Sequence, residues 1–359
     1  MTRAWVEVDL AALCRNGAAV AARSGVPLMP MVKADGYGIG GLRAALALDA
    51  LEPWGFGVAT VDEGEELRRG GITRPIVVFT PIMRTEIDAL RRADLTPALG
   101  DPAVIESWTR TARDWHLQVD TGMSRAGLRW DDVGAHRDLL QRSRPSGVFT
   151  HFHSADLDDP SRDAQESRFA SALAALPERP ALVHAENGPA VEARAPSPWT
   201  ICRPGIFLYG VATRSGPLVP EPVVTVRARI VEIRTVPDGE TVSYGGTWRA
   251  EGPRRIATIP VGYADGYRRV LGNRGVALLG GRRIPVAGRV TMDMTMLDVT
   301  DTDAALGDVV TLLGRDGDEV LTVSELATLG ELSPYELLTG FRARLPRVYR
   351  QPDSVEAAA

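Results

Sequence analysis

The 359-residue chain has only one lysine, Lys33, and the other 40 of its 41 basic residues are arginines. Lysine and arginine are interchangeable as solvated surface charges, but a guanidinium with a pKa above about 12 cannot lose its proton and attack a carbonyl. A compositional bias that replaces lysine with arginine would leave a lysine only where its amine is needed. Lys33, within "MVKADGYGIG" (31–40), is therefore a candidate for amine chemistry. The alternative is an ordinary surface lysine that the bias has left in place.

Other scarcities exclude further classes. The two cysteines, Cys14 and Cys202, form no C-x-x-C pair and stand near no histidine cluster, so we expect reduced, mostly buried thiols and no metal site. No apolar run approaches the roughly 20 residues needed to cross a bilayer. The N-terminus, "MTRAWVEVDL", has acidic residues where a signal peptide has its apolar core. These features predict a cytoplasmic protein without membrane attachment.

The charge distribution points to small-molecule chemistry rather than to a polyanionic partner. The formal net charge is −5, and the arginines are scattered along the chain, so we expect neither nucleic-acid nor polybasic membrane binding. The chain is 44% hydrophobic and 24% charged, which is typical of soluble globular proteins. Its length suits two domains, or one large barrel with an appendage.

The first part of the chain alternates strand-like and helical segments. A helix is expected from residue 9 to a C-cap at Gly25, and segments rich in Ala, Glu and Arg follow at 84–94 and 161–176. Eight apolar runs read as buried strands, at 26–33, 54–60, 75–81, 95–100, 115–120, 147–152, 181–186 and 199–205. This pattern predicts a (β/α)8 TIM-type barrel over residues 1–220. A doubly wound open sheet is the alternative, but it usually has fewer strands, and no G-x-G-x-x-G opens the first helix.

Past "VPEPVV" (219–224) the pattern changes. β-Branched runs alternate with Gly, Asp and Asn turns, a short helix is expected around 322–330, and the last strand-like segment is "GFRARLPRVYR" (340–350). We therefore predict a mostly antiparallel β domain over residues 221–359. The sequence contains no internal repeat and no low-complexity segment.

Chemically distinctive residues fall at the ends of the predicted barrel strands, where barrel enzymes place their active sites. They are Lys33, His151, His184 and Arg203. The loops after the seventh and eighth strands, "HAENGPA" (184–190) and "RPGIFLYG" (203–210), carry glycines whose neighbouring N–H groups can surround a phosphate. An amine beside a phosphate cradle suggests a phosphorylated aldehyde held as a Schiff base, and pyridoxal 5′-phosphate (PLP) fits, with Arg203 facing its pyridine nitrogen. Sugar-phosphate aldolases are an alternative, but they usually place the lysine on a later strand and have no such β domain.

Motifs along nearly the whole chain resemble those of the alanine racemases, in the same order. Besides "MVKADGYGIG", "HAENGPA" and "RPGIFLYG", they are "WVEVDLAAL", "VDTGMSRAG", "FTHFHSAD", "SYGGTW", "PVGYADGY", "GRVTMDM" and "RLPRVY". The resemblance implies a PLP-dependent isomerase that interconverts L- and D-alanine and supplies D-alanine for peptidoglycan in the cell wall. It also implies a homodimer with shared active sites.

The resemblance assigns two catalytic bases. Racemisation removes a Cα proton from one face and returns one to the other, so two bases on opposite faces are the direct solution. They would be Lys33 and Tyr263, the latter from the partner subunit. An arginine opposite the pyridine nitrogen can only donate a hydrogen bond, so Arg203 would keep the electron sink weak and favour reprotonation over transamination. A related decarboxylase would have a glutamate there.

Further contacts are implied position by position. The cofactor phosphate would be bound by the hydroxyls of Tyr37 and Tyr349 and by the amides of Gly188, Gly205 and Ile206. Asn187 would also belong to the cofactor site. His151 would pack on the pyridine ring, and His184 would orient Arg203. Substrate-side contacts would come from Arg125 and from the partner's Met292 and Asp293.

Three positions depart from the family pattern. Gln118 stands where many members have a carbamylated lysine, so either its amide bonds Arg125 directly or a bound anion replaces the charge. Gly188 replaces a phosphate-binding hydroxyl, and Asp35 replaces a commoner asparagine. Other functions left open are a racemase of serine or of many amino acids, and a non-catalytic PLP-binding protein, which resembles the barrel alone.

Overall fold

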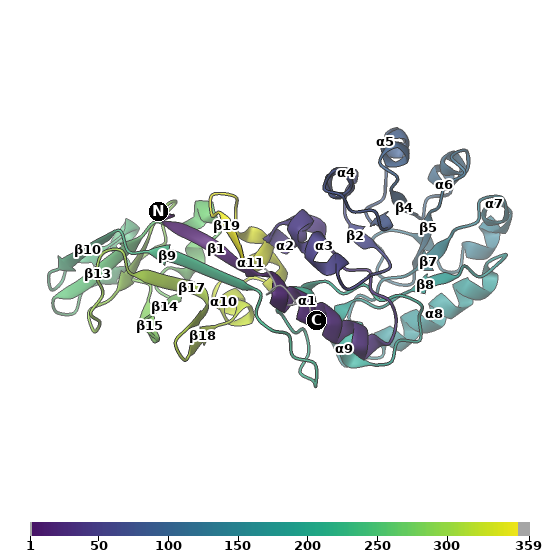
Figure 1. The fold of residues 1–359 in the computed structure, drawn as a ribbon. Helices are drawn as coiled ribbons and strands as arrows, with labels where there is room; N and C mark the ends of the chain where they lie inside the picture. Colours follow the sequence, from purple (N-terminus) through teal and green to yellow (C-terminus); the bar gives the residue numbers. More distant parts are fainter. Residues whose placement is uncertain (1, 351–359) are drawn as a thin grey trace, which may run out of the picture.

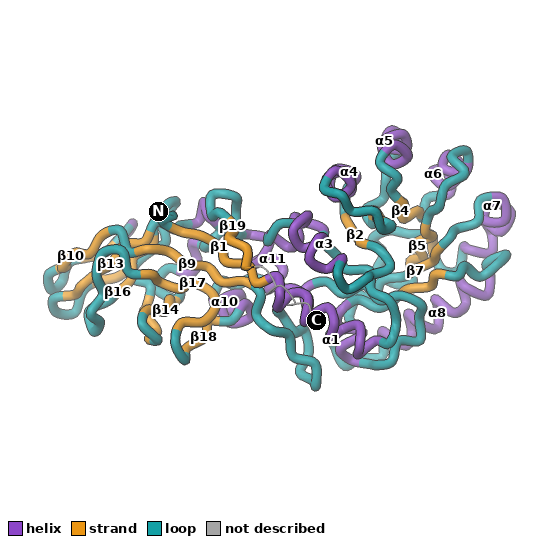
Figure 2. Tube along the Cα trace, in the orientation of Figure 1, coloured by secondary structure: helices purple, strands orange, loops and turns teal. Residues whose placement is uncertain are grey.

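A computed structural model describes residues 2–350 of the chain. An α/β barrel and a part built mainly of strands lie end to end, with helices α2, α3 and α11 between them (Figure 1). Figure 2 shows the contrast: the barrel strands are short and surrounded by helices, whereas the other part is mostly strand and loop.

The barrel is a closed ring of eight parallel segments, as predicted. Six are regular strands: β2 (Phe56–Val58), β3 (Ile76–Val78), β4 (Thr96–Leu99), β5 (His116–Asp120), β7 (Gly147–Phe149) and β8 (Leu182–His184). The other two segments pair through isolated parallel bridges, Leu28 with Cys202, Met31 with Gly57 and Asn187 with Arg203. The first segment contains Pro30, which has no N–H for the ladder, and this accounts for its interrupted pairing. A two-residue strand, β6 (Leu128–Arg129), adds to β5.

Several helices begin or end at local sequence signals. Helix α1 is capped by the Asp9 carboxylate, which accepts from the Ala12 amide at 2.8 Å, and it ends at Gly25 with a left-handed φ of 69°. A capping box of Thr60 and Glu63 opens α4. The helices are α1 (Leu10–Ser24), α2 (Lys33–Gly38), α3 (Gly41–Asp49), α4 (Val61–Arg69), α5 (Ile87–Arg92), α6 (Pro102–Thr109), α7 (Arg137–Arg142), α8 (Ser161–Ala175), α9 (Gly188–Ala193), α10 (Val323–Leu329) and α11 (Pro334–Gly340).

The mostly antiparallel β part is also confirmed. Its main sheet has the order β15-β14-β17-β9-β1-β19, with β18 on β17. These strands are β1 (Ala4–Asp9), β9 (Val224–Arg229), β14 (Val276–Leu279), β15 (Arg282–Pro285), β17 (Val309–Asp316), β18 (Glu319–Leu321) and β19 (Arg347–Arg350). A second sheet joins β10 (Glu232–Val236), β13 (Arg254–Ile259) and β16 (Thr295–Asp298), and a hairpin joins β11 (Thr241–Val242) to β12 (Trp248–Arg249).

The first strand belongs to the sheet of the C-terminal part. β1 pairs antiparallel with β9 and parallel with β19, with Val6 opposite Val226 on one side and Arg347 on the other. The chain enters the barrel only at Leu10, where α1 begins. The range 1–220 proposed for the barrel therefore includes a strand that pairs outside it. The apolar side chains of β1 point into the core of the β part, and no local signal distinguishes them from barrel residues.

Within residues 2–350, none of the helices is both long and apolar enough to span a membrane. The same part of the chain holds no group of three or more potential metal-ligating side chains. Both cysteines are free, with Cys202 buried and Cys14 half-buried.

Candidate active site

A cavity of about 590 Å³ opens at the carboxyl ends of the barrel strands. Ten of the residues singled out in the sequence line it: Lys33, Tyr37, Gln118, Arg125, His151, Asn187, Gly188, Arg203, Gly205 and Ile206. His184 is fully buried directly beside Arg203. The barrel thus gathers on one surface residues that are up to 173 positions apart in sequence, since Lys33 and Ile206 both line it.

Lys33 opens a turn of unusual handedness. The next four residues, Ala34 to Tyr37, all have left-handed conformations, with φ between 53° and 60°. For a non-glycine residue this conformation costs roughly 1–2 kcal/mol. Three hydrogen bonds hold the turn: Ala34 N donates to Glu63 Oε1 at 2.7 Å, Gly41 N to Asp35 Oδ1 at 2.7 Å, and Gly36 N to the Val32 carbonyl at 2.9 Å. Asp35 suits this position because aspartate tolerates left-handed backbone and its carboxylate accepts locally.

The environment of Lys33 favours its neutral amine. The side chain is half-buried, and burial together with the positive charge of Arg125 lowers the pKa of Lys33, while Glu63 opposes the shift. A lowered pKa leaves more of the amine unprotonated at neutral pH, which is the form that attacks a carbonyl.

Arg203 is held by a buried chain of two histidines. Its Nη1 donates to His184 Nδ1 at 2.6 Å, and its Nη2 donates to the carbonyls of Thr150 (2.8 Å) and Ala185 (3.1 Å). His184 Nε2 lies 2.9 Å from Nδ1 of His116. Burial lowers the pKa of Arg203 to about 9, which still leaves it charged at neutral pH.

His116 was not predicted from the sequence. It stands on β5 two residues before Gln118, and its inward direction follows from the alternation of side chains along that strand. Burial, and then the Arg203 charge, lowers the pKa of His116 to about 3 and also lowers that of His184 well below its usual value. Both rings are therefore neutral. His151 faces the cavity, and burial followed by the charges of Arg203 and Arg125 lowers its pKa to about 3.

Two glycines and Tyr37 form an anion cradle at one end of the cavity. A Cβ placed on Gly188 would meet no atom closer than 3.9 Å, and one of those atoms is the Gly205 nitrogen, so the two backbones border an open space. A Cβ on Gly205 would lie 2.4 Å from the Tyr37 hydroxyl, so only glycine fits there. The Tyr37 ring stacks on Tyr209 with centroids 4.5 Å apart, and its hydroxyl makes no hydrogen bond within residues 2–350. Amide N–H groups and a free hydroxyl are the donors that a phosphate prefers.

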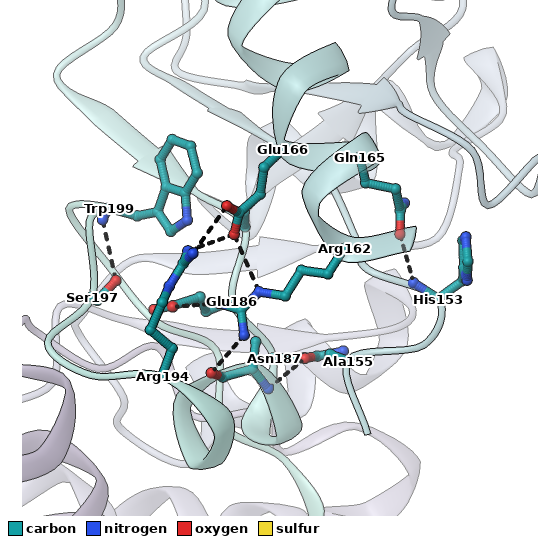
Figure 3. Close-up of polar contacts among 12 residues, drawn as sticks. His153, Ala155, Arg162, Gln165, Glu166, Glu186, Asn187, Arg194, Ser197 and Trp199 are labelled. Carbon is teal, nitrogen blue, oxygen red and sulfur yellow. Dashed lines mark hydrogen bonds and ion pairs between the residues drawn. The ribbon is translucent and has the colours of Figure 1, made fainter. Parts of the chain in front are cut away.

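The loop before α9 is supported from behind by an ion-pair network (Figure 3). Arg162 donates to Glu166 and to the fully buried Glu186, both at 3.2 Å, and Arg194 also pairs with Glu166. Asn187 caps α9 by accepting from the Ala190 amide at 3.2 Å. These contacts fix the segment whose backbone forms one side of the cradle.

Tyr349 is not part of this cavity, which corrects its predicted role at the phosphate. Its hydroxyl donates to the Ile39 carbonyl at 2.8 Å, because pairing of β19 with β1 places the ring against the segment that follows Tyr37. Gln118 also makes no bond to Arg125: its Nε2 donates to the Ala126 carbonyl at 3.2 Å. A small space of about 10 Å³ lies between Gln118, Arg125 and His151.

Tyr263, Met292 and Asp293 lie together on the β part, away from this cavity. The amides of Tyr263 and Ala264 donate to the carbonyls of Thr291 and Met292, each at 3.0 Å. Tyr263 is 37% exposed and Met292 53% exposed. Within one chain, therefore, Lys33 and Tyr263 belong to two separate surfaces.

The chain joins a parallel barrel to a β domain, and the mouth of the barrel carries a lysine amine, an anion cradle and a buried arginine. These features define a class of enzymes that bind a phosphorylated aldehyde through lysine. Residues 8–213 match the family described as alanine racemase, N-terminal domain, and residues 223–349 match alanine racemase, C-terminal domain.

Individual proteins agree with these matches. An alanine racemase of Deinococcus radiodurans is 41% identical over 97% of this chain and 99% of its own length. The crystal structure of alanine racemase from E. faecalis superposes with a TM-score of 0.92 at 30% identity, covering 97% of this chain and 98% of the other. A Bartonella henselae alanine racemase with covalently bound pyridoxal phosphate has a TM-score of 0.91 at 26% identity, covering 98% of this chain and all of the other.

The chain belongs to the alanine racemase family, whose members are PLP-dependent isomerases. The residues present fit that cofactor: Lys33 supplies the amine, Gly188 and Gly205 leave room for a phosphate, and Arg203 can only donate to a ring nitrogen.

Proposed function

We propose that this chain racemises alanine with two bases from different subunits, Lys33 of one chain and Tyr263 of its partner in a homodimer. The observation that carries the proposal is the separation of two surfaces. The cavity contains Lys33, whereas Tyr263, Met292 and Asp293 form an exposed group on the β part. Two copies related by a twofold axis can bring each group to the other's cavity, which completes two equivalent sites.

PLP, when bound, supplies an electron sink that makes the Cα proton of the amino acid acidic. Lys33 Nζ takes or returns that proton on one face, and the hydroxyl of the partner's Tyr263 does so on the other. Arg203 would donate to the pyridine nitrogen without giving up a proton, which would keep the sink weak and favour reprotonation at Cα. The buried His184 holds the guanidinium in place.

The other predicted residues serve binding. The amides of Gly188, Gly205 and Ile206 and the Tyr37 hydroxyl would hold the phosphate at the start of α9, which Asn187 caps. His151 would pack on the ring. Arg125, at the mouth of the cavity, would contact the phenolic oxygen and lie near the substrate carboxylate, with Met292 and Asp293 contributed by the partner.

Substrate range and cellular role extend the proposal. We propose alanine as the main substrate and a cytoplasmic role in supplying D-alanine for peptidoglycan. The alternative of serine or broad-spectrum racemisation is tested with a panel of L-amino acids followed by circular dichroism. Conversion of serine at a rate equal to that of alanine would overturn the preference.

Subunit mixing tests the shared site. Lys33→Ala and Tyr263→Phe should each be nearly inactive, because each removes one base from both sites. When the two variants are unfolded together and refolded, half of the dimers are mixed and each mixed dimer has one intact site, so roughly a quarter of wild-type activity should return. Each variant refolded alone is the control. A mixture no more active than the two controls would show that both bases act within one chain.

A further inference from the structure

The proposed second base lies in a short 3-10 turn, Tyr263–Asp265, with a glycine on each side. This turn packs tightly against two other segments of the β part. A Cβ on Gly262 would lie 2.3 Å from the carbonyl oxygen of Thr291, and a Cβ on Gly266 would lie 2.3 Å from the carbonyl oxygen of Gly340. The turn is therefore held between the loop that carries Thr291 and the segment that follows α11.

The turn ends in a buried carboxylate. Only 2% of Asp265 is exposed. Its Oδ2 accepts from the Gly262 amide at 2.9 Å, and its Oδ1 lies 3.0 Å from Nε of Arg344. A buried carboxylate is costly unless it is paired, and within residues 2–350 Arg344 is the only ion-pair partner of Asp265.

The same guanidinium also binds the loop that carries Met292 and Asp293. Nη1 of Arg344 donates to Oδ1 of Asp293 at 2.8 Å, and within residues 2–350 the Asp293 carboxylate makes no other hydrogen bond. Arg344 thus joins two carboxylates, one in the turn of Tyr263 and one in the substrate-side loop. A guanidinium presents its N–H groups in a rigid planar fork, so it fixes the two carboxylates relative to each other.

We propose that Arg344 is a positioning residue for the active site of the partner subunit, where it sets the arrangement of Tyr263 and Asp293 as they enter the other cavity. The proposal rests on the shared site described under the proposed function. Arg344 acts through the two segments it joins and needs no contact with the substrate. Misplacement of a reacting group by about 1 Å can slow a reaction by about 10²-fold, so the effect of this clamp should be measurable.

Subunit mixing shows which site Arg344 serves. Arg344→Gln should lower kcat/KM for alanine by roughly 10- to 100-fold. Refolded together with Lys33→Ala, it should return to roughly a quarter of wild-type activity, because half of the dimers then join an intact Lys33 to an intact turn of the other chain. Refolded together with Tyr263→Phe, it should recover nothing, because both variants damage the same side of the shared site. The reverse pattern, or recovery with neither partner, would overturn the assignment.

Arg344→Lys tests the fork without leaving Asp265 unpaired. A lysine keeps a cation beside the buried carboxylate, which preserves the fold, but a single ammonium does not hold two carboxylates in a fixed geometry. It should show the same mixing pattern with a smaller loss of activity. Wild-type activity in Arg344→Lys would show that the fork is not needed, and the proposal would fall.

The deuterium isotope effect gives a readout that a general loss of stability would not move. Weaker alignment of Tyr263 slows proton transfer on one face of Cα only. With α-deuterated substrates, the isotope effect on kcat/KM of Arg344→Gln should therefore rise for one enantiomer of alanine and not for the other. An equal change for both enantiomers, or no change for either, would contradict the proposed role.

Arg283→Gln is the matched control, because Arg283 on β15 also bridges two carboxylates of the β part, those of Glu319 and Glu325. It should keep activity within about twofold and leave both isotope effects unchanged. A loss equal to that of Arg344→Gln would show that any such clamp has this effect, against the assignment. If Lys33→Ala and Tyr263→Phe do not restore activity to each other, the shared site itself fails, and this inference fails with it.

Discussion

Arg203 donates to Nδ1 of His184 at 2.6 Å, and this bond sets the protonation of the two histidines behind it. An arginine has no acceptor atom, so His184 Nδ1 must accept and its proton lies on Nε2. That proton is then donated to Nδ1 of His116, 2.9 Å away. The chain of three side chains therefore has a single charge, located on the guanidinium at the cavity wall.

Neutral buried histidines predict a stability that falls in acid. The pKa of His116 is about 3 in the folded protein and about 6.5 in an unfolded chain, so between these values the unfolded state binds more protons. Unfolding free energy should therefore decrease as pH falls below about 6.5, by up to about 1.4 kcal/mol per pH unit for this one group. The melting temperature of His116→Gln, whose amide oxygen can still accept from His184, should fall less steeply between about pH 7 and about pH 5. Thermal unfolding of wild type, His116→Gln and the peripheral His136→Gln measures this, and equal slopes in all three would refute it.

Replacing Arg203 should change the outcome of the reaction as well as its rate. Arg203→Glu puts a carboxylate opposite the ring nitrogen, which would keep that nitrogen protonated and strengthen the sink. We expect racemisation to fall by about 10²–10³, as on loss of a preorganised donor, while pyruvate from transamination rises relative to D-alanine. Circular dichroism and a coupled pyruvate assay measure the two products. Arg203→Lys keeps a cationic donor and should form less pyruvate than the glutamate variant, and a reversed order would contradict the role of charge here.

Replacing each of the two cradle glycines by serine should change the dissociation constant of PLP in opposite directions. Gly188→Ser places its Cβ no closer than 3.9 Å to any neighbour, so the new hydroxyl can face the phosphate. The dissociation constant of PLP should fall by up to about tenfold, the value of one added hydrogen bond. Gly205→Ser places its Cβ 2.4 Å from the Tyr37 hydroxyl and should weaken PLP binding. Titration of both cofactor-free variants tests the pair, and tighter binding by Gly205→Ser would refute the geometry.

The left-handed turn after Lys33 should tolerate asparagine and reject β-branched residues. Asp35→Asn keeps an oxygen that accepts from the Gly41 amide and keeps a residue type that adopts positive φ. We expect its unfolding free energy to change by less than about 0.5 kcal/mol, whereas Asp35→Val should lose about 1–3 kcal/mol from backbone strain together with the lost bond. Chemical unfolding of the cofactor-loaded enzyme measures both, and equal stability of the two variants would contradict the argument.

Much of this fold could be predicted from the sequence because its signals are local. The barrel strands are short apolar runs bounded by Gly, Pro and helix caps, and each was located to within a few residues. The same logic predicts that polar residues at strand ends share one cavity, since parallel strands deliver their carboxyl ends to one rim, and Lys33, His151 and Arg203 do line one cavity. The pairing of β1 with β9 and β19 could not be predicted in this way, because nothing in "AWVEVD" specifies partners so far along the chain.

The assignments that failed depend on packing between distant segments. Tyr349 was assigned from its motif, but the register of β19 against β1 directs its hydroxyl to Ile39. The sequence pattern does not predict helix α11, whose close contact with Gly38 brings Tyr335 to the cavity lining. His116 has no comparable sequence signal, because it reaches Arg203 only through His184.

The position of β1 also bears on how the polypeptide is made. Synthesis proceeds from the N-terminus, so Ala4–Asp9 leaves the ribosome long before Val224–Arg229 and Arg347–Arg350, the two strands with which it pairs within residues 2–350. The backbone N–H and C=O groups of β1 therefore remain hydrogen-bonded to water while the whole barrel is translated. The sheet can close only after the last of these strands appears, which makes assembly of the β part a late and largely post-translational event.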